Sequence, residues 1–255
     1  MTLSSDHPPR LASLTFHGPF SEARAERLVG RLAATAPRTV LDIGCGWGEL
    51  LLRVLGAAPG ATGVGVDLNG EDLARGRAAA RERGLADRVL FAEESARDTG
   101  RGPADVVLCL GASQALSAAE PPRSAVEALH ALRRLVLPGG RVVLGEGFWQ
   151  RPPTADELAG MWPDARADEY LPLGDLVDAA IDAGFRPLWV ETASEEEWEE
   201  FESGYRCDAE EWLAAHPDHP EAAGTRARVD AQRATWLRGY RRVLGITYLT
   251  LVPVG

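Results

Sequence analysis

The stretch that decides the fold is Thr39-Val40-Leu41-Asp42-Ile43-Gly44-Cys45-Gly46-Trp47-Gly48-Glu49-Leu50. An apolar run with one acidic residue gives way to three glycines at alternate positions, and a helix-like segment follows over residues 49–55. This order predicts a buried strand, a tight turn and the start of a helix. Glycine suits a backbone that bends sharply or lies against a ligand, and a helix start offers N–H groups without intrahelical partners. The stretch therefore predicts either a plain strand-to-helix turn or a turn that holds a ligand.

The spacing of the glycines separates two families of nucleotide-binding turn. Dinucleotide-binding folds carry G-x-G-x-x-G, whereas this chain has glycines at 44, 46 and 48 and a glutamate at 49. With Asp42 in front, the pattern resembles D-x-G-x-G-x-G, the first motif of the class I S-adenosylmethionine (SAM) dependent methyltransferases. The resemblance implies SAM as cofactor and S-adenosylhomocysteine (SAH) as product. It places Asp42, Gly44, Cys45 and Gly46 at the cofactor.

Composition narrows the class of protein. The 255 residues carry a formal net charge of -11, which disfavours nucleic acid as a partner because phosphate backbones are repelled. The three cysteines, at positions 45, 109 and 207, are odd in number and far apart, which is typical of a reducing compartment rather than a disulfide framework. No apolar segment of signal or membrane length is present near the start. We expect a cytoplasmic protein without membrane insertion.

A second strand ends in an acidic residue at the offset that the resemblance implies. Residues 61–69 read as a strand that ends at Asp67, 23 positions after Gly44. An acidic side chain at such a tip can accept hydrogen bonds from both ribose hydroxyls, so Asp67 is the expected ribose anchor, with Leu68 near the adenine. The alternative is that Asp67 and Asn69 merely cap the following helix, and the two roles are compatible.

The third strand, residues 88–92, leads into a degenerate copy of the family's third motif. The resemblance places an acid or small polar residue there against the adenine amino group. By position, Glu94, Ser95 and Ala96 are the candidates.

The fourth strand, residues 104–110, is a nearly continuous apolar run, as expected of a buried parallel strand. The family places the turn after this strand beside the departing methyl group, which implicates Leu110, Gly111 and Ala112 in cofactor binding. The turn lacks the Asn/Asp-Pro-Pro-aromatic signature of amino-methylating DNA enzymes, another indication against nucleic acid.

A helix over residues 123–136 ends at Pro138-Gly139-Gly140 and is followed by a fifth strand, residues 141–146. The segment Leu135–Gly140 resembles the L-x-P-G-G element of small-molecule methyltransferases. The chain as a whole resembles the group related to quinone-biosynthesis methyltransferases.

Alternation of strands and helices over about a hundred residues predicts a parallel sheet with right-handed crossovers. We expect one α/β domain over residues 1–255, with a Rossmann-like, mostly parallel, seven-stranded sheet and helices on both faces. Its parts are an N-terminal cover (1–37), a SAM-binding core (38–146) and an acceptor-side half (147–255). That half is predicted to contain a helix (173–183), a sixth strand (185–192), a helical insertion (195–242) and a last strand (246–252).

The insertion carries an aromatic stripe at helical spacing, which predicts a helical hairpin whose rings pack into a core, with a minority facing the acceptor. In its second helix, Val229, Trp236, Leu237 and Tyr240 are expected on one side. The segment 216–220, His-Pro-Asp-His-Pro, suggests a turn rather than a metal site. We expect no metal.

Candidate acceptor contacts come from the strand ends and the mobile covers. They are His17, Ser113, Gln114, Phe148 and Trp149. An already nucleophilic acceptor needs no base. A hydroxyl acceptor needs one, for which His17 and Glu146 are candidates.

The predicted function is transfer of a methyl group from SAM to a small, partly apolar acceptor by in-line displacement, which depends largely on positioning. The sequence leaves the acceptor, the methylated atom and the oligomeric state open. Two other classes remain: a SAM-binding protein without catalysis, and a dinucleotide-dependent oxidoreductase, which the glycine spacing opposes.

Overall fold

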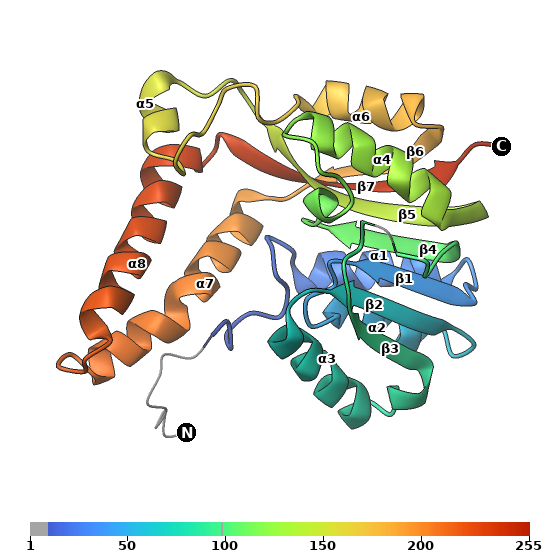
Figure 1. Cartoon of the computed structure of the whole chain (residues 1–255), viewed down its shortest axis with the longest axis horizontal. Coiled ribbons are helices and arrows are strands. Elements are labelled where there is room, and N and C mark those ends of the chain that lie inside the picture. The colour runs from blue at the N-terminus through green and yellow to red at the C-terminus, as the bar shows by residue number, and fades with distance from the viewer. Residues whose placement is uncertain (1–9, 98) are drawn as a thin grey trace. The chain divides into compact units, whose positions relative to one another are not determined.

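A computed structural model of the chain describes residues 10–97 and 99–255 (Figure 1). Within these residues seven strands form one sheet in the order β3-β2-β1-β4-β5-β7-β6. The strands are β1 (Thr39–Ile43), β2 (Thr62–Asp67), β3 (Val89–Glu93), β4 (Ala104–Leu110), β5 (Val136–Trp149), β6 (Phe185–Thr192) and β7 (Leu244–Pro253).

The α-helices alternate with these strands along most of the chain. They are α1 (Glu22–Ala33), α2 (Glu49–Ala57), α3 (Gly70–Glu82), α4 (Arg123–Leu135), α5 (Ala155–Ala159), α6 (Leu173–Asp182), α7 (Glu195–Ala215) and α8 (Ala222–Thr235). Two short 3-10 helices, η1 (Ala86–Arg88) and η2 (Ser113–Ala115), and a π-helix, η3 (Trp236–Tyr240), complete the elements.

The predicted α/β, mostly parallel sheet is confirmed. Strand β1 pairs in parallel with β2 and β4, and β2–β3 and β4–β5 are parallel as well. Strand β7 lies between β5 and β6 and runs antiparallel to β6. Because parallel strands end at the same edge, the turns after β1, β2 and β4 come together at one edge of the sheet.

Strand β5 is longer than the sequence predicted. It begins at Val136, five residues before the expected start at Arg141, and continues to Trp149, three residues beyond Glu146. At its start Val136 pairs with Ala104, whereas Arg141 pairs with Val106, so the residues between them form an irregularity within the ladder. The Pro-Gly-Gly segment therefore lies inside a paired strand rather than ahead of it.

Helix starts follow the capping residues of the sequence. The Asn69 side chain accepts from two backbone N–H groups at the start of α3, as predicted, and the Ser21 side chain caps α1 by accepting from the Arg24 N–H. Thr154 and Glu157 form a reciprocal capping box at α5. Such caps satisfy N–H groups that have no partner within the helix.

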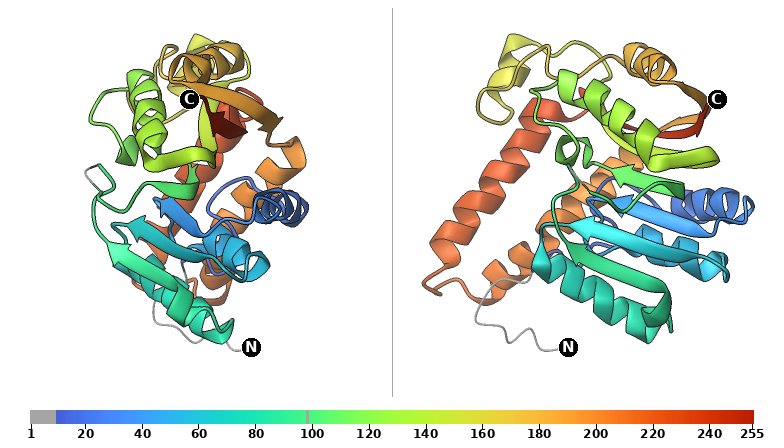
Figure 2. Two further views of the ribbon diagram at one scale, coloured as in Figure 1. Left: turned by 90° about the vertical axis from the view of Figure 1, so that its right-hand side faces the viewer. Right: turned by 45° about the vertical axis from the view of Figure 1, so that its right-hand side comes forward.

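The core of the sheet is made by the central strands and the helices against them. Helices α1 and α2 contact each other on one face, and α4 and α6 contact each other on the other face (Figure 2). Side chains of β4 and β5 such as Val107, Cys109, Val142 and Leu144 are fully buried in the resulting cluster. Burial on both faces explains the continuous apolar runs of these strands.

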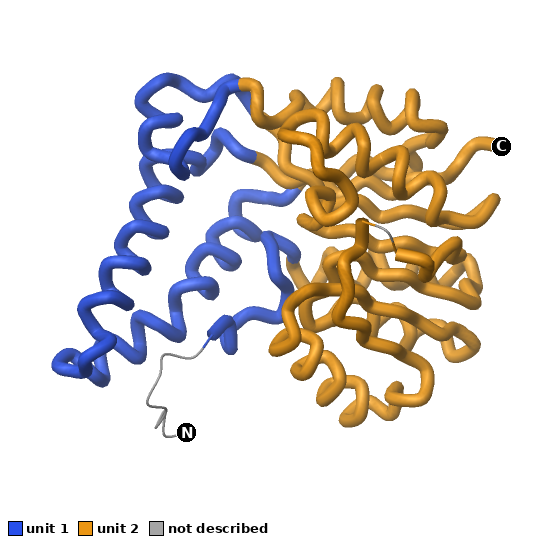
Figure 3. Tube along the Cα trace, viewed as in Figure 1, with its two compact units in different colours: residues 1–20, 150–167, 193–244 blue, residues 21–149, 168–192, 245–255 orange. Residues whose placement is uncertain are grey.

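The chain divides into two compact units (Figure 3). Unit 1 consists of residues 1–20, 150–167 and 193–244, and unit 2 of residues 21–149, 168–192 and 245–255. Unit 2 contains nearly all of the sheet with α1 to α4 and α6. The predicted boundary at residue 147 does not coincide with this division, because α6, β6 and most of β7 belong to the sheet unit. The expectation of a single domain stays a prediction.

The second helix of the insertion departs from its predicted pattern. Trp236 and Tyr240 are buried as expected, but the Leu237 side chain is half exposed. The α-helix gives way at Trp236 to a π-helix, which contains more residues per turn and so changes which side chains share a face. The expectation that Leu237 lies on the buried side was wrong for this reason.

Among the residues that the structure describes, no helix combines the length and the apolar character needed to cross a membrane.

Candidate functional site

The glycine loop of unit 2 joins the end of β1 to the start of α2. Gly44, Gly46 and Gly48 all have positive φ, at 62°, 54° and 67°. A Cβ on Gly44 would lie 2.3 Å from the Cβ of Ala112, in the turn after β4. Only glycine adopts this backbone without strain, so the alternate glycines of the sequence are required by the shape of the loop.

The Asp67 carboxylate ties this loop to the end of β2. Its Oδ2 accepts from the Gly46 backbone N–H at 2.8 Å, and its Oδ1 accepts from the Asn69 N–H at 2.8 Å. A carboxylate offers about four acceptor positions, so two remain for a bound molecule. Asp67 is only half buried. The next residue, Leu68, exposes 72% of its surface, which leaves an apolar side chain free for contact beside the carboxylate.

Asp42 lies beneath the loop in β1 and is buried. Burial, and after it the charge of Asp67, raise the pKa of Asp42 to about 8. Burial, with the charges of Asp42 and Asp67, also raises the pKa of the Cys45 thiol, which therefore stays protonated. Asp42 therefore makes the underside of the loop sensitive to pH.

We expect Asp42 to make stability fall as pH rises from about 4 to 8. In this window the folded state keeps a proton on Asp42 that the unfolded chain has lost, so the free energy of unfolding decreases with increasing pH. Asp42→Asn removes this contribution, and its free energy of unfolding should change less between pH 5 and 8. Urea unfolding at several pH values measures the free energy of unfolding of both proteins. Asp87→Asn, at an exposed position, is the control. Parallel pH curves for Asp42→Asn and wild type would contradict the assignment.

The three candidates for the adenine contact, Glu94, Ser95 and Ala96, have different surroundings. Glu94 forms an ion pair with Arg101 at 2.8 Å and accepts from the Thr99 hydroxyl. The Ser95 hydroxyl accepts from a backbone N–H two residues later, and the Ala96 side chain packs in the core. The Glu94 carboxylate is thus engaged with its own loop. A role for these three residues at the adenine stays a prediction.

The turn after β4 is held against β5. Gly111 has φ 65°, and its N–H donates to the Gly145 carbonyl at 2.8 Å. Ala112 is buried and meets the glycine loop through its Cβ, as described above. Leu110 is half buried at the strand end. These residues lie at the same sheet edge as the glycine loop, and their role in cofactor binding stays a prediction.

Ser113 and Glu146 form a buried polar pair at this edge. The Ser113 hydroxyl hydrogen-bonds to the Glu146 carboxyl, and Glu146 Oε1 also accepts from the Gly147 N–H at 3.1 Å. Glu146 Oε2 is buried and has no hydrogen-bond partner among the described residues. Burial raises the pKa of Glu146 despite these two bonds, which favour the ionised form. A buried carboxyl with one oxygen unused is rare in folded proteins and is a candidate for function.

The other acceptor candidates of unit 2 are placed differently. Gln114 is exposed, and its Nε2 donates to the Gly111 carbonyl at 3.3 Å. Phe148 and Trp149 are buried at the end of β5. The Trp149 ring meets the Tyr170 ring edge-on, with centroids 5.0 Å apart.

Tyr170 was missed by sequence reasoning. A Cβ on Gly147 would lie 2.4 Å from Tyr170 Cε1, so the ring packs directly on the strand next to Glu146. Burial and the nearby charges of Glu169 and Glu146 raise the pKa of Tyr170 to about 12. Tyr170 lies in an irregular segment far along the chain, and no periodicity or motif could have indicated it.

His17 belongs to unit 1, where its side chain is exposed. Its role at the acceptor stays a prediction. Across residues 10–97 and 99–255, no cluster of three or more His, Cys, Asp or Glu side chains has an arrangement that could hold a metal ion. His216 and His219 instead pack against the ring of Trp212 in the turn of the hairpin.

Three similarities to known proteins agree with this geometry. Residues 41–142 match a family model described as "Methyltransferase domain". The chain is 29% identical over 238 residues to the uncharacterised protein YjhP of Escherichia coli K12, covering 92% of this chain and 93% of that one. It is 40% identical over 114 residues to a ubiquinone biosynthesis O-methyltransferase of Pseudomonas paraeruginosa, but this match covers only 44% of this chain and 45% of the relative.

Solved structures extend the likeness over nearly the whole chain. The crystal structure of YjhP has a TM-score of 0.79 at 27% identity and covers 96% of this chain and 100% of that one. A SAM-dependent methyltransferase from Geobacter sulfurreducens, crystallised with SAH, has a TM-score of 0.80 at 25% identity, covering 96% and 98%. Taken with the strand order and the glycine loop, these matches identify a class I S-adenosylmethionine-dependent methyltransferase domain in this chain.

Proposed function

We propose that the protein transfers a methyl group from SAM to a small-molecule acceptor. The observation that carries the proposal is the glycine loop, with three consecutive alternate glycines at positive φ and the Asp67 carboxylate bonded to Gly46. A Cβ at Gly44 would lie 2.3 Å from the Cβ of Ala112, so glycine lets the loop pack directly against the turn after β4, and these are the two segments at which the fold family binds its cofactor. When bound, SAM supplies an electrophilic methyl group on a positively charged sulfur.

In this proposal each side of the loop has a part in binding. Asp67 accepts from the ribose hydroxyls with its two remaining acceptor positions, and Leu68 packs against the adenine. The turn of Leu110, Gly111 and Ala112 lies beside the departing methyl group. Ser113, Gln114, Phe148 and Trp149 follow on at the acceptor side.

Names of relatives support a small-molecule acceptor. Among the matching proteins are ubiquinone biosynthesis O-methyltransferases and a demethylmenaquinone methyltransferase. Their matches cover about half of their length, so the support concerns mainly the cofactor half. The net charge of -11 points the same way, since it disfavours nucleic acid as acceptor.

The acceptor side offers one group that could receive a proton. Glu146 Oε2 is buried, lacks a partner among the described residues and lies on the carboxyl next to Ser113. In the proposed reaction it accepts the proton that an acceptor hydroxyl loses as its oxygen forms the bond to the methyl carbon. Because burial raises the pKa of Glu146, it is a stronger base when ionised than an exposed glutamate.

The proposal is tested by calorimetry with SAH and by turnover. Purified protein is incubated with SAM and a panel of phenols, quinols and amines, and SAH is quantified by mass spectrometry. SAH binding together with acceptor-dependent SAH formation supports methyl transfer. SAH binding without turnover of any acceptor would favour a SAM-binding protein without catalysis, and absence of SAH binding would refute the proposal.

Glu146→Gln should separate acceptor chemistry from cofactor binding. The amide keeps the shape of the side chain but cannot take a proton, so the rate with a hydroxyl acceptor should fall by about 10²–10⁴-fold while SAH affinity stays the same. The wild-type rate should rise with pH as Glu146 ionises, and this rise should vanish in the variant. Ser113→Ala, which removes a bond to the ionised carboxyl, should move the rise to higher pH. An unchanged pH profile in both variants would exclude Glu146 as the base.

A further inference from the structure

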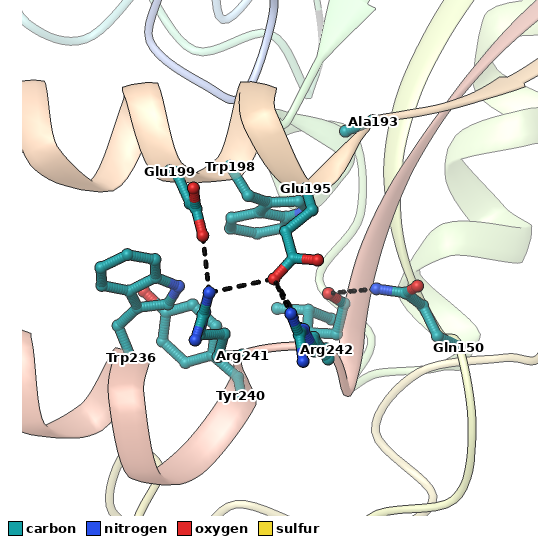
Figure 4. A pocket seen from close by; sticks show the side chains of 10 residues that line it. Gln150, Ala193, Glu195, Trp198, Glu199, Trp236, Tyr240, Arg241 and Arg242 are labelled. Carbon is teal, nitrogen blue, oxygen red and sulfur yellow. Dashed lines mark hydrogen bonds and ion pairs between the residues drawn. The ribbon is translucent and has the colours of Figure 1, made fainter.

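Unit 1 contains a cavity of about 100 Å³ that the proposed methyl transfer does not use. One wall comes from the start of α7, with Glu195, Trp198 and Glu199, and the other from the π-helix η3 and the residues after it (Figure 4). Side chains of the two segments face each other across the space. All the residues that line the cavity belong to unit 1.

Two residues that line this cavity each carry a buried N–H donor without an acceptor among the described residues. Over residues 10–97 and 99–255, three buried side-chain polar atoms have no hydrogen-bond partner: Glu146 Oε2, Trp198 Nε1 and Arg241 Nε. The last two belong to residues that line this one cavity. An unpaired buried donor costs about 1–3 kcal/mol, and such groups are few in folded proteins. Two of them together at a hollow indicate a place where an acceptor atom binds.

The backbone of the second wall is unusual in two respects. The Arg241 N–H donates to the Trp236 carbonyl at 3.0 Å, five residues back, which closes the π-helix. Arg242, next in the chain, has φ 61°, a conformation that is uncommon for residues other than glycine. Single π-turns and left-handed residues occur preferentially at functional sites. Here they bring Trp236, Tyr240 and Arg241 to the same cavity.

The charges around the cavity are already paired. Arg241 Nη2 bonds Glu195 at 3.0 Å and Glu199 at 2.6 Å, and Arg242 Nε bonds Glu195 at 2.6 Å. Two guanidinium groups therefore balance two carboxylates. A further anion would meet both carboxylates without a free positive charge, and a further cation would meet both guanidinium groups, so the lining favours an uncharged ligand.

Three aromatic rings also line the cavity, together with Gln150, Ala193 and Leu244. The Trp198 and Tyr240 rings lie with centroids 5.9 Å apart, and the Arg241 guanidinium lies 5.7 Å from the Trp236 ring centre. The Tyr240 hydroxyl donates to Glu202, so Tyr240 offers the cavity its ring and not a free hydroxyl group. Aromatic walls with a few placed donors are typical of sites for small organic molecules.

We propose that this cavity binds a small uncharged organic molecule through a carbonyl oxygen, which accepts hydrogen bonds from Trp198 Nε1 and Arg241 Nε. A cavity of about 150 Å³ is known to hold benzene. A volume of about 100 Å³ therefore holds about four non-hydrogen atoms, which suits the carbonyl end of a small amide, lactam or ketone. Its test requires neither SAM binding nor methyl transfer.

The probe is 2-pyrrolidinone, a neutral lactam whose amide end has this size, and the readout is the indole N–H resonance of Trp198 in protein with ¹⁵N-labelled tryptophan. The chain has seven tryptophans, so the resonance is assigned through the backbone and by its loss in Trp198→Phe. On addition of the lactam it should move downfield and exchange more slowly with solvent, with a dissociation constant in the millimolar range. Contacts from the lactam methylenes to the Trp236 ring in the wild-type protein locate the ligand without any variant.

Two variants and one second probe complete the test. Trp198→Phe keeps a ring but removes one donor, so the lactam should bind about fivefold to tenfold more weakly. Trp189→Phe, at a half-exposed ring on β6 in unit 2, should leave binding unchanged. Butyrate, of similar size but charged, should bind more weakly than the lactam. Butyrate binding as tightly as 2-pyrrolidinone, or a Trp198 resonance that responds to neither probe, would overturn the proposal.

Discussion

Gly44→Ala is expected to abolish or weaken SAH binding by at least about tenfold and to lower the free energy of unfolding by about 2–5 kcal/mol. Gly44 has φ 62°, which disfavours any residue with a Cβ. The added Cβ would also lie 2.3 Å from the Cβ of Ala112. Neither atom can move without its backbone, so the loop and the turn after β4 must separate.

The matched control is the same substitution in a helix. A Cβ on Gly30, in α1, would meet nothing within 4 Å. A glycine in the middle of a helix destabilises the folded protein by about 0.5–1 kcal/mol relative to alanine. Gly30→Ala should therefore preserve SAH affinity and increase stability slightly. Calorimetry and urea unfolding on both variants measure the difference. If Gly44→Ala bound SAH as tightly as Gly30→Ala does, the loop would not be the cofactor site.

Asp67→Ala should weaken SAH binding by about 1.5–3 kcal/mol for each ribose bond that is lost. The substitution also frees the Gly46 and Asn69 N–H groups, which now donate to the carboxylate at 2.8 Å. Asp67→Asn keeps one acceptor oxygen, so its SAH affinity should lie between those of Asp67→Ala and the wild type. Glu71→Ala, at an exposed position in the first turn of α3, serves as control. Equal SAH affinity for a folded Asp67→Ala and Glu71→Ala would contradict the ribose assignment.

Local sequence signals predicted the cofactor half of the fold well. Strand β1, the turn at Gly44, Gly46 and Gly48, and the cap at Asn69 depend on interactions between residues close in sequence, and the structure has them where they were expected. Buried parallel strands can also be recognised in the sequence, because both of their faces must be apolar. The limits of β5 were less predictable, since its first part is paired through an irregularity with Ala104 that only the partner strand determines.

The polar groups at the acceptor side were predictable only as residue types at strand ends. Glu146 could be named from its place after an apolar run, but its contact with Ser113, its burial and its unpaired Oε2 depend on the packing of β5 against η2. Tyr170 packs on Gly147 from a segment without regular structure, so nothing near either residue in the sequence indicated the pair.

The glycine loop, the acidic strand tip and the alternation of strands and helices are all encoded by neighbouring residues, through backbone geometry and hydrophobic periodicity, and were therefore predictable from the sequence. Which polar atoms stay unpaired depends on packing between elements that are distant in sequence. Trp198 and Arg241 are more than forty positions apart, and both line one cavity because the start of α7 and the segment that follows the π-helix face each other (Figure 4). Partners across such distances depend on how whole elements pack, and no local pattern contains that information.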